Sequence, residues 1–287
     1  MNEQKELNNR IDALPSLRQL VETMDMRARK SLGQHFLFDL TLTRQIARSS
    51  GTLNGTTIEV GPGPGGLTRA LLLEGAAHVI AIEKDRRAAA VLAELATAAG
   101  KRLCLIEADA MQSAIWEMGT TPRRIIANLP YNIATKLLIR WLTHAFAFES
   151  MTLMFQREVA ERITARPNDS AYSRLSVLTR WLANSEILFD VPPSAFVPEP
   201  KVTSSVVQIV PLPAPRFPCS QTALEDVTRI AFGQRRKMLR SSFKNIGGER
   251  LLNSAKIDPK KRPQEINVEE FCRLAFLYAA QENNRAQ

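Results

Sequence analysis

A run of glycines at 61–66, GPGPGG, is the first segment of this chain that could bind a ligand. It follows an apolar stretch and precedes a helix-like one. Glycines permit a tight turn and a close backbone approach, and a helix N-terminus presents free N–H groups. Gly61, Gly63 and Gly66 fit G-x-G-x-x-G, and Gly61, Gly63 and Gly65 fit G-x-G-x-G. The glycines alone do not separate a nicotinamide dinucleotide from S-adenosylmethionine, and a plain tight turn is the structural alternative.

Two carboxylates follow at the ends of later apolar stretches. Glu83 lies 22 positions after Gly61, where an acid can accept hydrogen bonds from both hydroxyls of a ribose. Asp109, in EADAM at 107–111, could accept a hydrogen bond from an adenine amino group. The alternative for Asp109 is a helix N-cap or a turn. The glycine run, Glu83 and Asp109 thus place residues that can bind a ligand at three successive strand ends, which predicts a cofactor pocket.

The segment Asn128-Leu129-Pro130-Tyr131 ends the next apolar stretch. The Asn128 amide oxygen and the Leu129 carbonyl are acceptors that could hold an exocyclic amino group. Tyr131 could stack on a planar base, a contact worth roughly 1–3 kcal/mol. The tetrapeptide could equally be a turn. In line with the three preceding sites, however, it indicates methyl transfer to an amine of a nucleobase.

Alternating strand-like and helix-like segments must position these residues. Strands are expected at 56–60, 78–83, 102–108, 123–128 and 150–156, and helices at 66–75, 86–99 and 135–146. Nearly continuous apolar strands alternating with amphipathic helices predict an α/β fold with a parallel sheet covered on both faces. Ligands bind at the carboxyl ends of such strands, where the candidate residues fall.

Composition restricts the class of protein further. The 287 residues are 45% hydrophobic and 23% charged, which excludes disorder as the main state. The net charge of +9 makes a polyanionic partner plausible. No apolar run reaches the roughly 20 residues that a membrane span needs, and no secretory signal is visible. Cys104, Cys219 and Cys272 show no metal or disulfide spacing, which favours a reducing, cytoplasmic setting.

Most of the positive charge lies near the C-terminus. Residues 221–262 hold eleven bases and four acids, just after the proline-rich linker PLPAPRFP at 211–218. We therefore expect a domain boundary there and a small helical domain beyond it. Within FGQRRKMLRSSFK at 232–244, Arg236, Arg240 and Lys244 recur every four residues, which predicts a basic stripe on one helix. The stripe could bind phosphates or be an ordinary solvated face.

Several blocks together resemble the ribosomal RNA adenine N6-dimethyltransferases, and in particular their bacterial small-subunit branch. They are KSLGQHFL (30–37), IEVGPGPGGLT (58–68), NLPY (128–131), FQREVAERI (155–163), AYSRLSVL (171–178), VPPSAFVPEPKVTSSVV (191–207) and FGQRRKMLR (232–240). The resemblance implies a Rossmann-like class I methyltransferase sheet at 29–212. It also implies a small helical RNA-contacting domain at 213–287 and an N-terminal extension at 1–28.

The resemblance also implies roles for single residues. S-adenosylmethionine would be the cofactor, without a metal, held by His35, Leu37, Gly61, Gly63, Glu83, Asp109 and Asn128. The catalytic group would be Asn128, Leu129, Pro130 and Tyr131, with Phe196 stacking on the second face of the adenine. His35 stands where many relatives carry Asn. RNA would be bound by Arg235, Arg236, Lys237, Arg240 and Lys244.

The implied substrate is a pair of adjacent adenosines in the loop of the 3′-terminal helix of 16S ribosomal RNA. It would be met within a pre-formed small subunit by a monomeric, cytoplasmic enzyme. Three alternatives remain open: a nicotinamide-dependent dehydrogenase, a non-enzymatic RNA-binding assembly factor, and a methyltransferase of large-subunit RNA. The dehydrogenase leaves Asn128–Tyr131 and the basic C-terminal segment unexplained, and the assembly factor leaves the cofactor pocket unexplained.

Overall fold

The computed structural model describes residues 2–23 and 33–285, which form two compact units. The first unit is Met1–Ala160 with Glu186–Pro211, and the second is Glu161–Ser185 with Leu212–Gln287. The segment 161–185 was expected in the large domain, but it belongs to the compact unit that holds the C-terminus. Packing explains this difference, because α8 (Arg174–Leu182) contacts both α9 (Gln221–Gly233) and α12 (Val268–Arg285).

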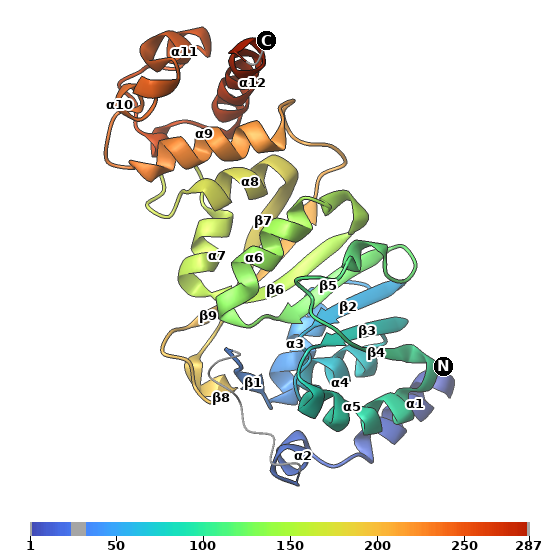
Figure 1. The fold of residues 1–287 in the computed structure, drawn as a ribbon. Coiled ribbons are helices and arrows are strands. Elements are labelled where there is room, and N and C mark those ends of the chain that lie inside the picture. The colour runs from blue at the N-terminus through green and yellow to red at the C-terminus, as the bar shows by residue number, and fades with distance from the viewer. Residues whose placement is uncertain (1, 24–32, 286–287) are drawn as a thin grey trace. The chain divides into compact units, whose positions relative to one another are not determined.

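A seven-stranded sheet forms the centre of the first unit (Figure 1). The strand order is β4-β3-β2-β5-β6-β9-β7. The bounds are β2 (Thr56–Val60), β3 (His78–Glu83), β4 (Leu103–Glu107), β5 (Arg123–Asn128), β6 (Ser150–Gln156), β7 (Ala183–Val191) and β9 (Ser204–Pro211). The strands β2 to β6 pair in parallel, as expected, whereas β9 runs antiparallel to β6.

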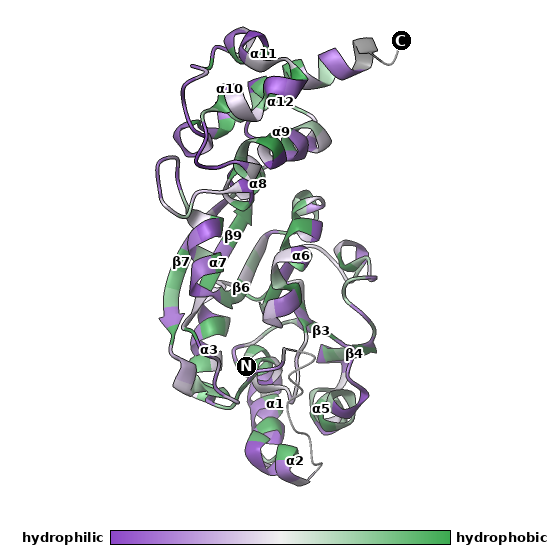
Figure 2. Ribbon diagram, turned by 60° about the vertical axis from the view of Figure 1, so that its left-hand side comes forward, coloured by the Kyte–Doolittle hydropathy of each residue, from purple (hydrophilic) through white to green (hydrophobic). Residues whose placement is uncertain are grey.

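The prediction of a wholly parallel sheet was therefore wrong at one edge. No strand was assigned to 183–211, where β7 and β9 lie. The connection from β7 to β9 contains no α-helix, and a parallel return to the sheet needs a long crossover. The central strand β2 is buried along its whole length, including its two threonines and one glutamate. Figure 2 shows green, hydrophobic stretches on the strands and helices of this unit alternating with purple, hydrophilic ones.

The order of the strands reverses between β2 and β5. From β2 the chain steps through β3 to β4 on one side, and from β5 it steps to β6 on the other. In open α/β sheets, ligands bind at the carboxyl ends of the strands at such a switch point. The glycine run leaves β2 at this point, and Asn128 ends β5 beside it. The topology thus brings together two of the segments that were predicted to bind ligands.

Helices cover both faces of the sheet. Right-handed crossovers place α4 (Gly66–Leu73) and α5 (Arg86–Ala99) on one face and α6 (Tyr131–Leu142) on the other. The helix α3 (Leu40–Ser49) packs against α4. The helix α6 begins four residues before its expected start, because the Pro130 carbonyl accepts bonds from the first free N–H groups. No helix among the described residues has both the length and the apolar character needed to cross a membrane.

Two helices precede the part of the chain that the family resemblance covers. They are α1 (Asn2–Asp12) and α2 (Leu17–Thr23). The helix α1 packs on α4 and α5, where Leu7 is 1% and Ile11 2% exposed. Arg10 donates from Nε to the Ala98 carbonyl at 2.9 Å. The described part of the expected extension at 1–28 is therefore built into the core of the first unit.

A small two-stranded sheet joins distant parts of the first unit. The strand β1 (Phe36–Leu37) pairs antiparallel with β8 (Phe196–Val197). In this register Leu37 lies opposite Phe196 and Phe36 opposite Val197. Two of the sequence blocks that carried the family resemblance are therefore neighbours, although about 160 residues separate them along the chain.

The second unit is mainly helical, with α8, α9, α10 (Leu239–Ser242), α11 (Gly248–Ser254) and α12, while α7 (Arg157–Thr164) crosses the boundary between the units. The single helix expected at 232–244 was wrong. The helix α9 ends at Gly233, a turn follows, and α10 begins only at Leu239. The N–H groups of Leu239 and Arg240 donate to the carbonyls of Lys261 and Pro259, which interrupts the helical pattern.

Candidate functional site

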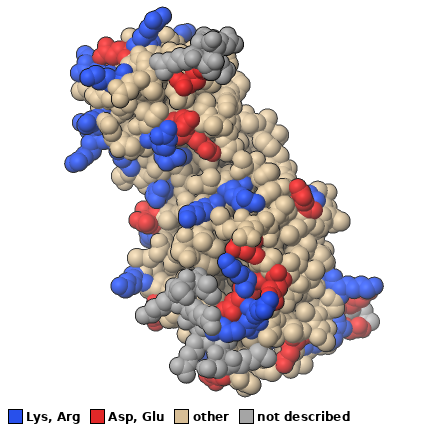
Figure 3. All heavy atoms as spheres, in the orientation of Figure 1, with Lys and Arg blue, Asp and Glu red and all other residues tan. Residues whose placement is uncertain are grey.

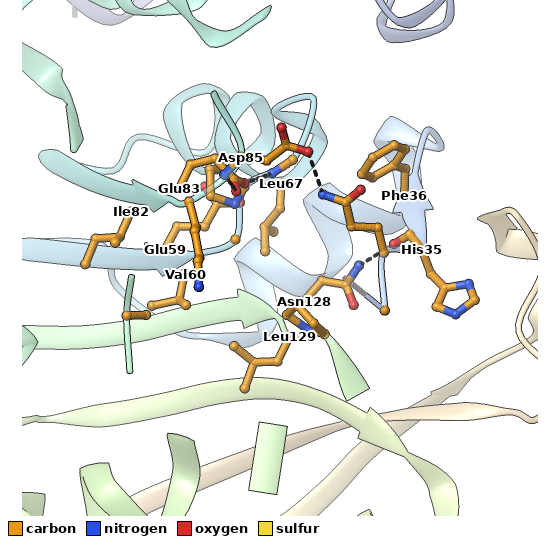
Figure 4. A pocket seen from close by; sticks show the side chains of 18 of the residues that line it. His35, Phe36, Glu59, Val60, Leu67, Ile82, Glu83, Asp85, Asn128 and Leu129 are labelled. Carbon is orange, nitrogen blue, oxygen red and sulfur yellow. Dashed lines mark hydrogen bonds between the residues drawn. The ribbon is translucent and has the colours of Figure 1, made fainter. Parts of the chain in front are cut away.

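An open cleft lies at the carboxyl ends of β2, β3 and β5. It contains about 1010 Å³ of space not filled by atoms, counted out to the open solvent at its mouth. Figure 4 shows its lining residues converging from separate elements. Every residue predicted to bind the cofactor lines this cleft, and so does the whole of Asn128–Tyr131. Phe196 is not among the lining residues.

The glycine run adopts the conformation that its composition predicted. Gly61, Gly63 and Gly65 have φ values of +70°, +54° and +92°, in the left-handed region. Gly66 serves a different purpose, because a Cβ atom there would lie 2.4 Å from the Leu37 carbonyl oxygen. Three glycines therefore shape the turn, and the fourth lets β1 approach the start of α4.

Glu83 is 6% exposed, and both of its oxygens bind the main chain. Oε2 accepts from the Gly63 N–H at 3.1 Å, and Oε1 accepts from the Asp85 N–H at 2.7 Å. Burial raises the pKa of the Glu83 carboxyl, and these main-chain bonds oppose the rise. A carboxylate oxygen has more than one acceptor position, so Glu83 can still accept from a ribose hydroxyl.

Asp109 faces the same cleft beside Lys84. Its Oδ2 lies 2.8 Å from Lys84 Nζ, and its Oδ1 accepts from the Met111 N–H at 2.9 Å. The hydrogen bond from Lys84 holds the pKa of Asp109 below its ordinary value, so the group is ionised at neutral pH. The turn considered as an alternative for Asp109 is present, and the carboxylate lines the cleft as well.

The orientation of the Asn128 side chain is fixed by the segment before β1. Its Nδ2 donates to the His35 carbonyl at 3.0 Å, the dashed line beside His35 in Figure 4. With the nitrogen engaged, Oδ1 is the amide atom available to a ligand. The next residue, Leu129, is 1% exposed, and its carbonyl precedes Pro130. Asn128 Oδ1 and the Leu129 carbonyl, the two acceptors predicted for an amino group, therefore belong to neighbouring residues at the end of β5.

Tyr131 is fixed through its hydroxyl group. This group lies 2.5 Å from the Ser204 hydroxyl at the start of β9. Ser204 is fully buried, so the tyrosine ring has a rigid partner. Burial raises the pKa of Tyr131, and the phenol is therefore neutral at physiological pH. Ser204 was not foreseen, because no strand had been assigned to its segment.

His35 meets the cleft with its main chain, and its imidazole points away from the residues predicted to hold the cofactor (Figure 4). The ring contacts Tyr131 at 5.3 Å between centroids, and its Nδ1 lies 2.7 Å from the Pro198 carbonyl. Phe196 is 1% exposed and belongs to the hydrophobic core. The structure thus brings His35, Tyr131 and Phe196 together, but it does not place Phe196 on the surface of the cleft.

Sequence reasoning missed Glu59, which lines the cleft from the middle of β2. It is 1% exposed, and its Oε2 accepts from the Thr68 hydroxyl at 2.7 Å. Burial raises the pKa of Glu59 to about 8. A signal was present, since TTIEV places one acid in a strand that is otherwise suited to complete burial.

Gln34 and Asp85 were also missed. Gln34 Nε2 donates to Asp85 Oδ2 at 3.3 Å, which joins the N-terminal segment to the start of α5. Asp85 caps α5, and the hydrogen bond from Arg87 holds its pKa below the ordinary value. The position of Asp85 before a predicted helix was the available signal for the cap. The link to Gln34 depends on tertiary structure and had no local signal.

The residues predicted to bind RNA all lie in the second unit. They do not share one helical face: Arg235, Arg236 and Lys237 are in the turn after α9, Arg240 is in α10, and Lys244 is in a 3₁₀ turn. Four of the five are exposed, the exception being Arg235, which donates to the Ser170 carbonyl. Figure 3 shows Lys and Arg side chains around α10 and α11, with some acidic side chains nearby.

The model of a family described as ribosomal RNA adenine dimethylase matches residues 25–280 of this chain. The chain belongs to this family. The Ribosomal RNA small subunit methyltransferase A of Rhodospirillum rubrum is 56% identical over 266 residues, covering 92% of each protein. Its counterpart from Sinorhizobium medicae is 54% identical over 269 residues, covering 92% of this chain and 98% of that protein.

Solved structures share the fold. A dimethyladenosine transferase from Plasmodium falciparum has a TM-score of 0.69 at 24% identity, over 88% of this chain and 98% of that one. The 23S rRNA methyltransferase ErmE has a TM-score of 0.63 at 25% identity, over 85% and 99%. The expected Rossmann-like class I methyltransferase fold is therefore confirmed.

This ribosomal RNA adenine dimethylase is an S-adenosylmethionine-dependent methyltransferase, as expected. Features of the cleft fit that cofactor. The left-handed glycines let the main chain come close to a ligand, and the acceptors Glu83 and Asp109 match ribose hydroxyls and an adenine amino group. Membership of the ribosomal RNA adenine dimethylase family, rather than the cleft alone, excludes the dehydrogenase alternative.

Proposed function

We propose that this chain dimethylates N6 of two adjacent adenosines in the loop of the 3′-terminal helix of 16S ribosomal RNA. The substrate would be a pre-formed small subunit in the cytoplasm, and the enzyme would act as a monomer. The observation that carries the proposal is the fixed amide of Asn128 beside the Leu129 carbonyl and the Tyr131 ring. Support for the small subunit comes from relatives with 50–56% identity whose names specify it.

The residues around the end of β5 would prepare the amine. The lone pair of an adenine amino group is conjugated with the ring and is a weak nucleophile. Asn128 Oδ1 and the Leu129 carbonyl would accept hydrogen bonds from its two N–H groups and favour a tetrahedral nitrogen. Tyr131 would hold one face of the adenine by stacking, and Phe196 would hold the other. Positioning of the amine is then the main contribution of these residues to the rate.

The cofactor, when bound, supplies an electrophilic methyl group. His35 and Leu37, with the glycines and Glu83, would hold it so that the methyl faces Asn128. Asp109 would accept from its adenine amino group. Because the amine retains one hydrogen after a first transfer, the same acceptors could orient it for a second. The mechanism requires no side-chain nucleophile.

The basic residues of the region 213–287 would hold the RNA by its phosphates. The target base must leave its stack to enter the cleft, as base-modifying enzymes require. Arg236, Lys237, Arg240 and Lys244 are exposed and suited to phosphate contacts. The cleft would then catalyse methyl transfer, and the basic residues of the second unit would provide most of the affinity for RNA.

Replacement of Asn128 by Ala tests the proposed function. The variant should lose dimethylation of small subunits by at least about 100-fold, because the amine loses an oriented acceptor. Binding of S-adenosylmethionine, measured by calorimetry, should remain detectable. Asn132→Ala is the matched control, because Asn132 is exposed at the start of α6. Dimethylation by Asn128→Ala at the wild-type rate would refute the role of the amide.

The choice of subunit is tested separately with purified small and large subunits from cells that lack the enzyme. Mass spectrometry of the RNA should detect dimethyladenosine in the small subunit alone. The large subunit is included because the structural neighbour ErmE is a 23S rRNA methyltransferase. Product in the large subunit alone would refute the proposed substrate while leaving the methyltransferase chemistry intact.

A further inference from the structure

The burial of Phe196 conflicts with the role proposed for its ring. The ring is 1% exposed, whereas a stacking residue must present a face to the base. Its backbone is fixed by the pairing of β8 with β1, and its side chain packs in the core of the first unit. For the base to reach Phe196, a neighbouring group must therefore move.

The imidazole of His35 is a neighbour of the Phe196 ring on the side of Tyr131. It packs edge-on against Phe196, with 6.4 Å between centroids and 82° between planes. It also stacks on Tyr131, with 5.3 Å between centroids and 28° between planes. The same ring thus contacts both aromatic residues between which the target adenine is proposed to lie.

The ring of His35 is also the easiest of the three to displace. The phenol of Tyr131 is bonded to the buried Ser204, and Phe196 lies in the core. The imidazole is only half-buried, and within the part of the chain that the structure describes its hydrogen bond runs from the ring Nδ1 to the Pro198 carbonyl. The His35 carbonyl holds the Asn128 amide independently of the ring, so the side chain can rotate without disturbing that amide.

We propose that the His35 imidazole is a place-holder for the target base, which displaces it to stack between Tyr131 and Phe196. This inference rests on the proposed function. Entry of the base then exchanges one stacked ring for another. A purine offers a larger face than imidazole and gains from the exchange, whereas a single-ring pyrimidine gains little. His35 is on this basis a specificity-determining residue that favours adenine over cytosine.

A graded series of His35 variants tests the proposal. The readout is the single-turnover rate of methyl transfer at saturating small subunit. His35→Ala and His35→Gln should each raise this rate roughly fivefold, because stacking of a small ring no longer competes with the base. His35→Trp should lower it, because a larger ring competes better. Affinity for S-adenosylmethionine should change little in all three, because His35 meets the cleft with its main chain and the imidazole points away from it. Affinity for the subunit and the unfolding midpoint should also change little.

The glutamine variant separates the ring from its hydrogen bond. Its side-chain amide can still donate to the Pro198 carbonyl but cannot stack like imidazole. A wild-type rate for His35→Gln would show that the link to Pro198 matters and would overturn the proposal. Unchanged rates throughout the series would overturn it equally.

Free adenosine provides a test that does not depend on the ribosomal substrate. Its binding can be followed through the ring proton resonances of Tyr131. Adenosine should bind His35→Ala more tightly than the wild-type protein, and cytidine should show a smaller gain. Equal adenosine affinity for both proteins would overturn the place-holder role. Failure of the wild-type enzyme to methylate small subunits would instead overturn the proposed function alone.

Discussion

The side chain of Glu59, in the wall of this cleft, has a pKa far above the ordinary value of a glutamate. It is an acid in a fully buried strand, bonded to the Thr68 hydroxyl. Burial raises its pKa to about 8, so the carboxyl is mostly protonated at pH 7. A neutral carboxyl tolerates this position, whereas an ionised one would be costly.

Replacement of Glu59 by Gln should therefore remove a dependence of stability on pH. The folded-state pKa lies above the ordinary value of 4.5, so folding favours the protonated form. The contribution of Glu59 to stability is fully present below pH 4.5 and is lost as the pH rises to about 8. Glu59→Gln should match the wild type near pH 5 and exceed it by up to about 4 kcal/mol near pH 8.

Urea unfolding at a series of pH values measures this difference, and Glu94→Gln provides a control on the exposed side of α5. A constant gap between wild type and Glu59→Gln from pH 5 to pH 8 would contradict the raised pKa. The control should show little change with pH relative to the wild type.

Residue types and spacing located most of the cleft, because each ligand-competent residue lies at the end of a predicted strand or directly after it. Glu83 and Asn128 are examples, since a strand end needs only local pattern to be recognised. The hydrogen bond from Asn128 to the His35 carbonyl was not predictable. It joins residues 93 positions apart and depends on how β1 packs.

At the level of elements, β1 approaches the start of α4 closely at the wall of the cleft, which both Leu37 and Gly66 line. A Cβ atom on Gly66 would lie 2.4 Å from the Leu37 carbonyl. Gly66→Ala should lower the free energy of unfolding by roughly 1–3 kcal/mol through overpacking. It should also weaken S-adenosylmethionine binding, because β1 carries Leu37 at the cleft.

Gly233→Ala is the matched control, because Gly233 is also helical and its Cβ would meet no atom within 4 Å. It should be neutral or stabilising by up to about 1 kcal/mol, as expected for alanine in a helix. Urea unfolding and calorimetry measure both effects. Equal changes in the free energy of unfolding for Gly66→Ala and Gly233→Ala would show that the close approach of β1 does not affect stability.

The elements with clear periodicity were predictable, and those set by tertiary bonds were not. The segment HVIAIE has four consecutive apolar residues, rich in β-branched side chains, and this local pattern is enough to predict a strand. The interruption between α9 and α10 depends on hydrogen bonds to the carbonyls of residues 259 and 261. No local pattern in the segment 232–244 predicts these bonds. The strands β7 and β9 were unassigned, so the antiparallel edge was missed with them.

For the whole molecule, the uneven distribution of charge predicts how substrate binding responds to salt. Reversal of two exposed bases, Arg236→Glu with Lys244→Glu, should weaken binding of the small subunit. The slope of log K against log salt should become shallower by about 0.7–0.9 for each phosphate that is no longer neutralised. Filter binding at several salt concentrations measures the slope.

The double reversal Lys5→Glu with Lys101→Glu is the control, because both side chains are exposed in the first unit and the change in charge is the same. Its salt slope should stay close to that of the wild type. Equal slopes for the two double variants would mean that the C-terminal bases act only through net charge.

Composition alone indicated a polyanionic partner, and the linker at 211–218 indicated two parts. The first unit ends at Pro211, close to that linker, but the second unit also takes up 161–185. A prediction from the sequence divides the chain into continuous segments. It could not place 161–185 with the C-terminal helices, because α8 contacts α9 and α12 only through tertiary packing.

The position of α1 has a practical consequence for anyone who shortens the chain. The family match begins at residue 25, which makes that point a tempting place to start a recombinant protein. Leu7 and Ile11 cover apolar surface on α4 and α5, and α4 begins directly after the glycine turn. A protein that began at residue 25 would expose that surface to water, and its poor solubility could be mistaken for a defect of the active site.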